Sequence, residues 1–207
     1  KRVGRLAATA ELAIVNLYQG RFQEAADLAD TAVEDGPFEL SSDPLAPYVN
    51  EASPEIIFEM SFSNIDNAGV NATGGRGEAF PAARLVNESE PGDIRTGVGE
   101  VDSDSLFYSF SGRLRTNKWT DTNLGDDYPL LRVSEMYLVR AEALARLGTN
   151  DAEARQYVNA IRNRAGLGDV DPTLSGQPLI DEIIRQRRFE LAFEGKYRLT
   201  LDRLERD

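Results

Sequence analysis

The chain has 207 residues, of which 41% are hydrophobic, so it is long enough and apolar enough to form a packed domain. Its 23 Lys and Arg residues against 35 Asp and Glu residues give a net charge of −12, which disfavours nucleic acid and anionic membranes as partners. Because the sequence contains no cysteine and no histidine, disulfides, thiolate or histidine metal sites and Ser-His-Asp catalysis are excluded within this chain.

The start of the chain runs directly into a helical pattern. It begins at Lys1 without a methionine or a signal peptide, so we expect a segment of a longer protein. No stretch reaches the roughly 18 consecutive apolar residues that a membrane-spanning helix needs. We therefore expect no membrane span in this segment.

Residues 6–34 have the spacing of two helices that separate at Gly20. Small or apolar residues recur at helical intervals, at Leu6, Ala10, Ala13, Ile14 and Leu17 and then at Phe22, Ala25, Ala26, Ala29 and Val33. The glycine at the turn and Pro37 beyond the second helix also fit one copy of the tetratricopeptide helical hairpin.

A second helical hairpin is predicted over residues 134–166. Ser134 is placed to cap its first helix, Gly148 to end that helix, and Asn150 or Asp151 to open the second. A further helix is predicted over 178–194. The fold class expected from these segments is mainly α, built from tetratricopeptide-like hairpins.

The long segment 37–133 between the two hairpins has a different composition. Residues 55–62 and 106–121 carry the β-branched and aromatic side chains of short strands, whereas 64–77 is rich in Gly and Asn. We expect a loop-rich insertion with short strands and a long exposed loop, which is the usual place for binding residues on a rigid scaffold. One domain is thus expected over 1–207, with a hairpin at 1–36, the insertion at 37–133, and a hairpin plus C-terminal helix at 134–207.

Two glutamates near the end of the chain, Glu190 and Glu194, are four residues apart and would share one face of the predicted helix. Like charges at this spacing destabilise a helix, so basic partners are expected. A glycosidase would use such carboxylates as acid and nucleophile, but those groups usually come from separate elements around a cleft. We favour a structural set of salt bridges that joins the glutamates to nearby arginines: Arg162, Arg164, Arg187 and Arg188.

Other motifs are weaker. The 64–77 loop has the Asp and Asn content of a calcium loop without its spacing, so no metal site is predicted. Its glycines lack the Gly-Lys-Ser/Thr ending of a phosphate loop. Trp119, with Tyr108, Phe110 and Tyr128 nearby in sequence, could stack on a sugar ring or pack in the core, and both alternatives stay open.

Three segments in succession resemble the C-terminal part of the SusD/RagB family. They are "DDYPLLRVSEMYLVRAEALARLG" at 126–148, "AEARQYVNAIRNRAGL" at 152–167 and "LIDEIIRQRRFELAFEGKYRLTLDRL" at 179–204. Upstream, "LYQGRFQEAADLADTAV", "SPEIIFEMSF" and "PGDIRT" also follow the succession usual in that family. The last motif departs from the family pattern, because Tyr197 stands where an arginine is usual.

The resemblance implies an outer-membrane surface lipoprotein of Bacteroidetes-type bacteria. Such proteins capture a glycan or another nutrient and act as a lid on a TonB-dependent, SusC-like transporter, without a cofactor and without catalysis. The N-terminal part of the family, with its lipid-bearing cysteine, is absent from this chain, so contact with the membrane would be through an anchor outside it. The implied fold, a tetratricopeptide-type scaffold carrying loops and short strands, agrees with the pattern read from the residues.

For capture of a sugar, stacking on aromatic rings and hydrogen bonds from polar side chains would supply the affinity. The predicted ligand-binding residues are Asn64, Asp66, Asn67, Asn71 and Arg76 in the loop, with Tyr108 and Trp119 behind it. Two alternatives remain, a tetratricopeptide-like adaptor that binds a protein segment and a carboxylate-dependent glycosidase.

Overall fold

The computed structural model describes residues 4–49, 53–63, 65–66, 80–99, 105, 107–120 and 125–204. The helices are α1 (Arg5–Tyr18), α2 (Phe22–Glu34), α3 (Ala46–Val49), α4 (Ala83–Asn87), α5 (Val133–Leu147), α6 (Asp151–Arg164), α7 (Gly176–Glu190) and α8 (Lys196–Leu204). The strands are β1 (Ile56–Met60), β2 (Val98–Gly99), β3 (Phe107–Phe110), β4 (Arg113–Thr116) and β5 (Tyr128–Arg132). The mainly α fold predicted from the sequence is confirmed.

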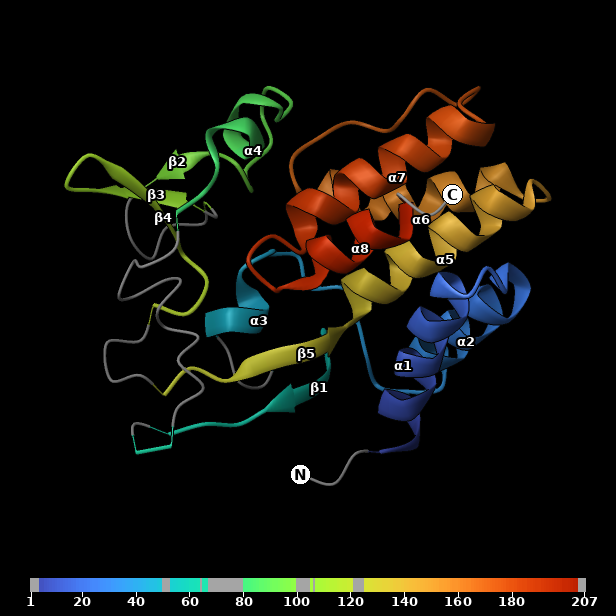
Figure 1. The fold of residues 1–207 in the computed structure, drawn as a ribbon, viewed down its shortest axis with the longest axis horizontal. Helices are drawn as coiled ribbons and strands as arrows, with labels where there is room; N and C mark the ends of the chain where they lie inside the picture. Colours follow the sequence, from blue (N-terminus) through green and yellow to red (C-terminus); the bar gives the residue numbers. More distant parts are fainter. Residues whose placement is uncertain are drawn as a thin grey trace.

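Both predicted helical hairpins are present (Figure 1). The turn between α1 and α2 contains Gly20 at φ 75°, and α5 ends at Gly148 in the left-handed conformation at φ 65°, where a side chain would be strained. Asn150 caps α6, because its side chain accepts a hydrogen bond from the Glu153 backbone N–H. Local sequence rules therefore account for these helix ends.

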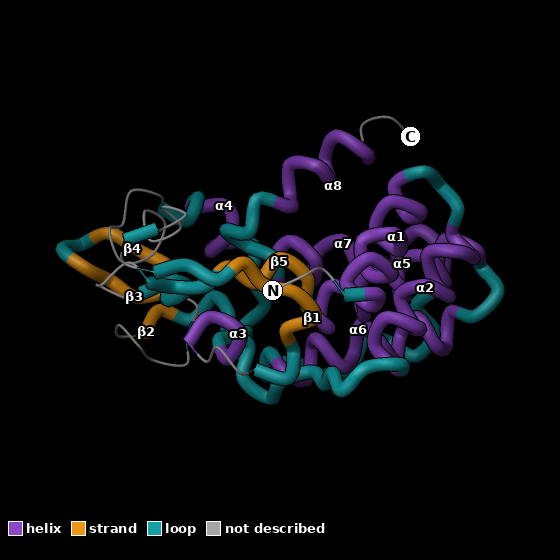
Figure 2. The backbone as a smooth tube through the Cα atoms, turned by 90° about the horizontal axis from the view of Figure 1, so that it is seen from below, coloured by secondary structure: helices purple, strands orange, loops and turns teal. Residues whose placement is uncertain are grey.

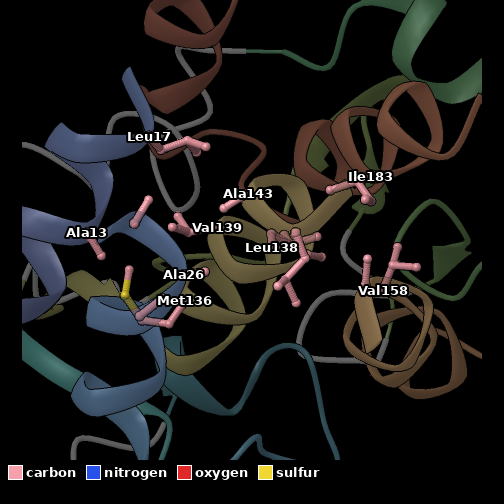
Figure 3. Close-up of a cluster of buried hydrophobic side chains, with 14 of the residues drawn as sticks. Ala13, Leu17, Ala26, Met136, Leu138, Val139, Ala143, Val158 and Ile183 are labelled. Carbon is pink, nitrogen blue, oxygen red and sulfur yellow. The ribbon is translucent and has the colours of Figure 1, made fainter. Parts of the chain in front are cut away.

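Helix α5 lies at the centre of the helical core, with the α1–α2 pair on one side and α6 and α7 on the other (Figure 3). On the first side Met136 and Val139 lie among small side chains such as Ala13 and Ala26, which let the helices approach closely. On the other side Leu138 lies toward Val158 and Ile183. The two hairpins thus pack directly against each other, although the insertion separates them in sequence.

The first and last strands of the insertion pair with each other. This pairing brings the two ends of the insertion together, so that α2 and α5 can be neighbours. Strand β1, near the start of the insertion, pairs antiparallel with β5, which leads directly into α5. A second sheet has the order β2-β3-β4, with β2 parallel to β3 and β3 antiparallel to β4. Figure 2 shows the β2-β3-β4 sheet at one end of the molecule and α2, α5 and α1 toward the other.

Several boundaries differ from the sequence predictions. Strands β2 and β5 and helices α3, α4 and α8 were not predicted. Ser134 does not cap α5, because the helix begins at Val133 and the Ser134 hydroxyl accepts a hydrogen bond from the Arg132 side chain at 2.5 Å. Among the described residues, no helix combines the length and apolar character of a membrane span.

The largest difference concerns Glu190 and Glu194, which do not share a helix face. Helix α7 ends at Glu190, and residues 191–195 form a turn before α8. Phe193 has φ 70° and Gly195 has φ 72°, a conformation that cannot continue an α-helix. The single helix predicted over 178–194 was therefore wrong at its C-terminal end.

Candidate functional site

Charged side chains gather in the interior, where the insertion meets the helical scaffold. We call this set the junction cluster; all of its members are buried, and they are Glu55, Arg95, Lys118, Arg132, Arg164, Glu190 and Glu194. Buried charges are tolerated only when they are paired and hydrogen-bonded, so the geometry of the pairs decides what the cluster does.

Arg132, at the end of β5, binds three carboxylates. Its Nη1 lies 2.6 Å from Glu55 Oε1 and 3.1 Å from Glu190 Oε1, and its Nη2 lies 2.8 Å from Glu194 Oε1. Arg164, the last residue of α6, also bridges two of them, at 2.7 Å to Glu55 Oε2 and 2.5 Å to Glu190 Oε1. The root of the insertion, the end of α6 and the end of α7 are thereby joined by charge-assisted hydrogen bonds.

Lys118, which follows β4, joins the insertion to the turn after α7. Its Nζ donates hydrogen bonds to the carbonyl of Glu190 at 3.1 Å, the carbonyl of Ala192 at 2.9 Å and Glu194 Oε1 at 2.8 Å. The Tyr48 hydroxyl of α3 donates to the same Glu194 oxygen at 2.7 Å. Because an ammonium group has three donors, Lys118 is fully satisfied within the protein.

A third contact comes from the segment after α4. Arg95 donates to both carboxylate oxygens of Asp93, at 3.0 and 2.8 Å, and to Gln186 Oε1 at 2.6 Å. The Ile94 backbone N–H donates to the Ala165 carbonyl at 3.0 Å. A side chain at Gly166 would lie 3.1 Å from the Gly92 carbonyl oxygen, so the close packing of this segment on the end of α6 requires a glycine there.

The electrostatics of the cluster bear on the glycosidase alternative. Burial raises the pKa of Glu190, but the guanidinium groups of Arg164 and Arg132 outweigh burial and hold this pKa well below its ordinary value. For Glu194, burial is likewise outweighed by Arg132 and Lys118, which lower the pKa to about 2. A catalytic general acid needs a raised pKa and access to substrate, and this buried, ionised pair has neither.

All six residues predicted for the salt-bridge set form ion pairs, but with a different pairing from the one expected. Of the four predicted arginines, only Arg164 pairs with Glu190, and none pairs with Glu194; Arg162 pairs with Glu90 and Glu182. Arg187 pairs with Glu135 at 2.6 Å, and Arg188 pairs with Glu88.

Sequence reasoning missed four members of the junction cluster, Glu55, Arg95, Lys118 and Arg132. These residues are far from Glu190 in sequence, and only the β1–β5 pairing brings two of them together. Three of them lie inside motifs that the sequence analysis used only for the resemblance: Glu55 in "SPEIIFEMSF", Arg95 in "PGDIRT" and Arg132 in "PLLRVSE". Lys118 lies in none of these motifs.

The tip of the β3–β4 hairpin presents a different arrangement. Phe110 and Arg113 are exposed there, whereas Arg115 is half-buried and Tyr108, farther from the turn, is buried. Ser111 and Gly112, with φ 53° and 75°, form the two-residue turn, and the register pairs Tyr108 with Arg115 and Phe110 with Arg113. These four side chains therefore share one face of the hairpin, because alternate residues of a strand point to the same side.

Two aromatic rings are exposed at this face. Arg115 Cζ lies 4.5 Å from the ring centroid of Phe110, which is 54% exposed, and Arg113 Cζ lies 5.3 Å from that of Phe80, which is 45% exposed. We call Phe80, Phe110, Arg113 and Arg115 the hairpin face. Sequence reasoning missed Phe80 and did not select Phe110. For Phe110, the Ser-Gly sequence between two segments of alternating side chains was a usable signal of a β-hairpin.

The predicted aromatic ligand residues lie in the interior. Trp119 is 1% exposed, stacks on Tyr128 at a centroid distance of 5.6 Å and meets Tyr48 edge-on at 5.3 Å. Tyr108 is 5% exposed. This burial favours the packing alternative for both rings.

The predicted loop residues are only partly within the described structure. Asp66 is exposed in a turn where its backbone N–H and carbonyl bond to Ser63. Asn64, Asn67, Asn71 and Arg76 lie outside the described residues. Their binding role stays a prediction, and the described chain resumes at Phe80, a member of the hairpin face.

A cavity of about 600 Å³ lies between α1, β5 and α8, and Glu194 of the junction cluster is among its lining residues. Its lining is largely apolar and aromatic, with Ile14, Val15, Tyr18, Tyr128 and Leu199 among the wall residues. The Lys196 ammonium in its wall already binds Glu135 and the Leu130 carbonyl. This cavity is therefore an apolar groove whose cation is satisfied internally.

Comparison with known proteins gives a consistent result. A family model described as the SusD family matches residues 102–206. The SusD-like protein P2 of Formosa agariphila is 30% identical over 141 residues, which is 64% of this chain and 26% of that protein. The starch-binding protein SusD of Bacteroides thetaiotaomicron is 40% identical over 125 residues, which is 53% of this chain and 21% of that protein.

Solved structures show the same fold at lower identity. A SusD-like carbohydrate-binding protein from Bacteroides vulgatus superposes with a TM-score of 0.80 at 21% identity, over 97% of this chain and 45% of that one. The surface glycan-binding protein A of Bacteroides uniformis superposes with a TM-score of 0.75 at 21% identity, over 99% and 50%. The chain therefore spans about half the length of these solved proteins and aligns with about a quarter of the first two relatives.

Proposed function

Because the chain belongs to the SusD family, we propose that it is the part of a cell-surface protein that helps to bind a glycan for uptake. In this proposal the full-length protein lies at the outer-membrane surface, held by a lipid anchor. It delivers the captured glycan, or another nutrient, to a TonB-dependent, SusC-like transporter. The protein binds its ligand without a cofactor and without hydrolysing it.

The observation that carries the proposal is the hairpin face. Exposed aromatic rings that are grouped on one surface form a binding platform, because sugar rings stack on aromatic faces through their apolar C–H groups. Phe80 and Phe110 are both exposed on the insertion, and arginine donors lie beside them. The junction cluster supports a binding role, because it fixes the insertion to the helices and so limits the ordering cost of binding.

The test is retention and hydrolysis of a panel of polysaccharides by the purified chain. We expect retention of at least one glycan without release of reducing sugar. The double variant Phe80→Ala plus Phe110→Ala should weaken retention. The control is Leu12→Ala plus Leu199→Ala, which also removes two exposed apolar side chains but from the helices. Release of reducing sugar, or no retention of any glycan, would contradict the proposal.

The contribution of the loop is tested separately. The double variant Asp66→Ala plus Asn67→Ala removes two polar groups of the predicted loop site without changing the hairpin face. We expect weaker glycan retention. Unchanged retention would remove the loop from the site and leave the hairpin face as its centre.

The adaptor alternative rests on the groove between α1, β5 and α8, whose apolar lining suits a protein segment. It predicts binding of a peptide and no retention on any polysaccharide, so the same panel separates the two functions. The glycosidase alternative has lost its candidate acid, because Glu190 and Glu194 are buried and ionised in the junction cluster.

A further inference from the structure

Two arginines of the hairpin face are set apart from the other arginines of the described chain. Within that part of the chain, every arginine except Arg113 and Arg115 donates a hydrogen bond or forms an ion pair. Among the described residues, the guanidinium groups of Arg113 and Arg115 contact aromatic rings and no carboxylate; the rings are those of Phe80 and Phe110. Their charge is therefore not neutralised by any described carboxylate.

This lack of partners is unexpected for the composition of the chain. Acidic residues outnumber basic ones by 35 to 23, so carboxylates are in excess, and elsewhere an arginine commonly has one or more of them. On the hairpin the register places both arginines on one face, with Arg113 directly across from Phe110 and Arg115 diagonal to it. The result is a local pair of positive charges on a protein of net charge −12.

The stacking also prepares both side chains for binding. A guanidinium group that lies over an aromatic ring uses its flat face for that contact and keeps its N–H donors at its edge. The terminal N–H groups match the two oxygens of a carboxylate or the oxygens of a sulfate group. In Arg115 the Nε atom is buried without a hydrogen-bond partner among the described residues, so its terminal nitrogens would make this contact. The rest of a sugar unit would meet the exposed parts of the Phe80 and Phe110 rings.

We propose that the hairpin face binds acidic sugar units, which carry a carboxylate or a sulfate ester, through Arg113 and Arg115. This inference rests on the proposed glycan binding and names its ligand class. Carboxylate and sulfate share the chemistry that the two guanidinium groups recognise. The overall negative charge of the protein would at the same time disfavour long polyanions such as nucleic acid.

The experiment compares matched polymers by affinity electrophoresis and calorimetry with the complete chain. One arm uses polygalacturonate and its methyl ester, which differ only in the carboxylate charge. The other arm uses dextran sulfate and dextran, which differ only in the sulfate. We expect tighter binding to the charged member of at least one pair, and the arm that shows it identifies the acid group.

The variant is Arg113→Gln plus Arg115→Gln, and the control is Arg5→Gln plus Arg198→Gln, which removes the same charge from exposed helix positions. We expect the hairpin variant to weaken binding of the charged polymer by about tenfold or more, as for loss of a charge-assisted contact, and to leave the neutral polymer unchanged. The control should bind like the parent chain. Equal weakening by the control would mean that only net charge matters and would overturn the inference.

The outcomes also separate this inference from the proposed function. Retention of neutral glycans without any preference for the charged polymer would overturn the acidic ligand class and leave glycan binding standing. Failure to bind any polymer, charged or neutral, in this experiment and in the polysaccharide panel would overturn both.

Discussion

The junction cluster and the hairpin face both contain cations beside aromatic rings, but the first holds the fold together and the second is the proposed binding surface. Both place cations over aromatic rings, since Lys118 and Arg132 lie 4.5 and 5.5 Å from the Tyr48 ring centroid, as Arg115 lies 4.5 Å from that of Phe110. The difference lies in the carboxylates. Arg132 has three acidic partners and is buried, whereas Arg115 has none among the described residues.

This comparison teaches that ring contacts alone do not distinguish a scaffold from a binding surface. A cation whose donors are satisfied by the protein fixes the fold, because removing one partner leaves another charge buried and unpaired. A cation that is held by a ring but lacks an anion keeps its donors available. Mutations in the junction cluster should therefore act on stability, and mutations in the hairpin face should act on binding.

The largest expected effect is that of Glu190→Ala. Glu190 lies against Arg164, Arg132 and Arg95 in the interior, so its loss leaves buried guanidinium groups without their shared anion. We expect the free energy of unfolding to fall by about 3 kcal/mol or more, measured by chemical denaturation. The control is Glu11→Ala, an exposed carboxylate on α1, which should change stability little. A similar denaturation midpoint for both variants would show that the cluster does not hold the fold.

A second effect on stability is expected from acid, through Glu194. Its pKa is lowered to about 2 in the folded protein, from an ordinary value of 4.5. The unfolded chain therefore takes up a proton before the folded chain does as the pH falls below 4.5. The stability contributed by this carboxylate is fully present above that pH and is lost progressively toward pH 2, by at most about 1.4 kcal/mol per pH unit.

Thermal unfolding of Glu194→Gln against the parent chain measures this contribution. The variant should be less stable at neutral pH, because Lys118 and Arg132 lose an anion, and its melting temperature should fall less steeply between pH 4.5 and pH 2. Parallel curves for the two proteins would mean that Glu194 is not the group that titrates. Other acid-sensitive pairs, such as Glu90 with Arg162, remain in both proteins and cancel in the comparison.

The helical scaffold was predictable because its signals are local. Alanine and leucine spacing, the turn glycines Gly20 and Gly148 and the cap at Asn150 each act within a few residues. The end of α7 was not predictable in the same way. It depends on Phe193 in a left-handed conformation, which a non-glycine residue adopts only where surrounding contacts favour it, here those of the junction cluster.

The candidate sites show the same difference between features set by local sequence and features set by long-range contacts. The pairing of Arg164 with Glu190 was within reach of sequence reasoning, because both residues belong to the helices at the end of the chain. The place of Glu55 and Lys118 was not, because it follows from long-range strand pairing and from the docking of the insertion. Phe110, Arg113 and Arg115 of the hairpin face could have been derived from the Ser-Gly turn and strand alternation. The contact of Phe80 with Arg113, and the lack of carboxylate partners among the described residues, are visible only in three dimensions.

The smallest expected change in stability is that of Arg113→Gln plus Arg115→Gln. Neither arginine forms an ion pair with a described residue, so the double variant breaks only contacts with Phe80 and Phe110 at the surface. We expect the free energy of unfolding to change by less than about 0.5 kcal/mol per substitution, while binding of an acidic glycan falls. Chemical denaturation and affinity electrophoresis on the same samples measure the two quantities. A loss of stability as large as that of Glu190→Ala would show that the hairpin arginines belong to the scaffold, because surface cations without anions have little folding energy to lose.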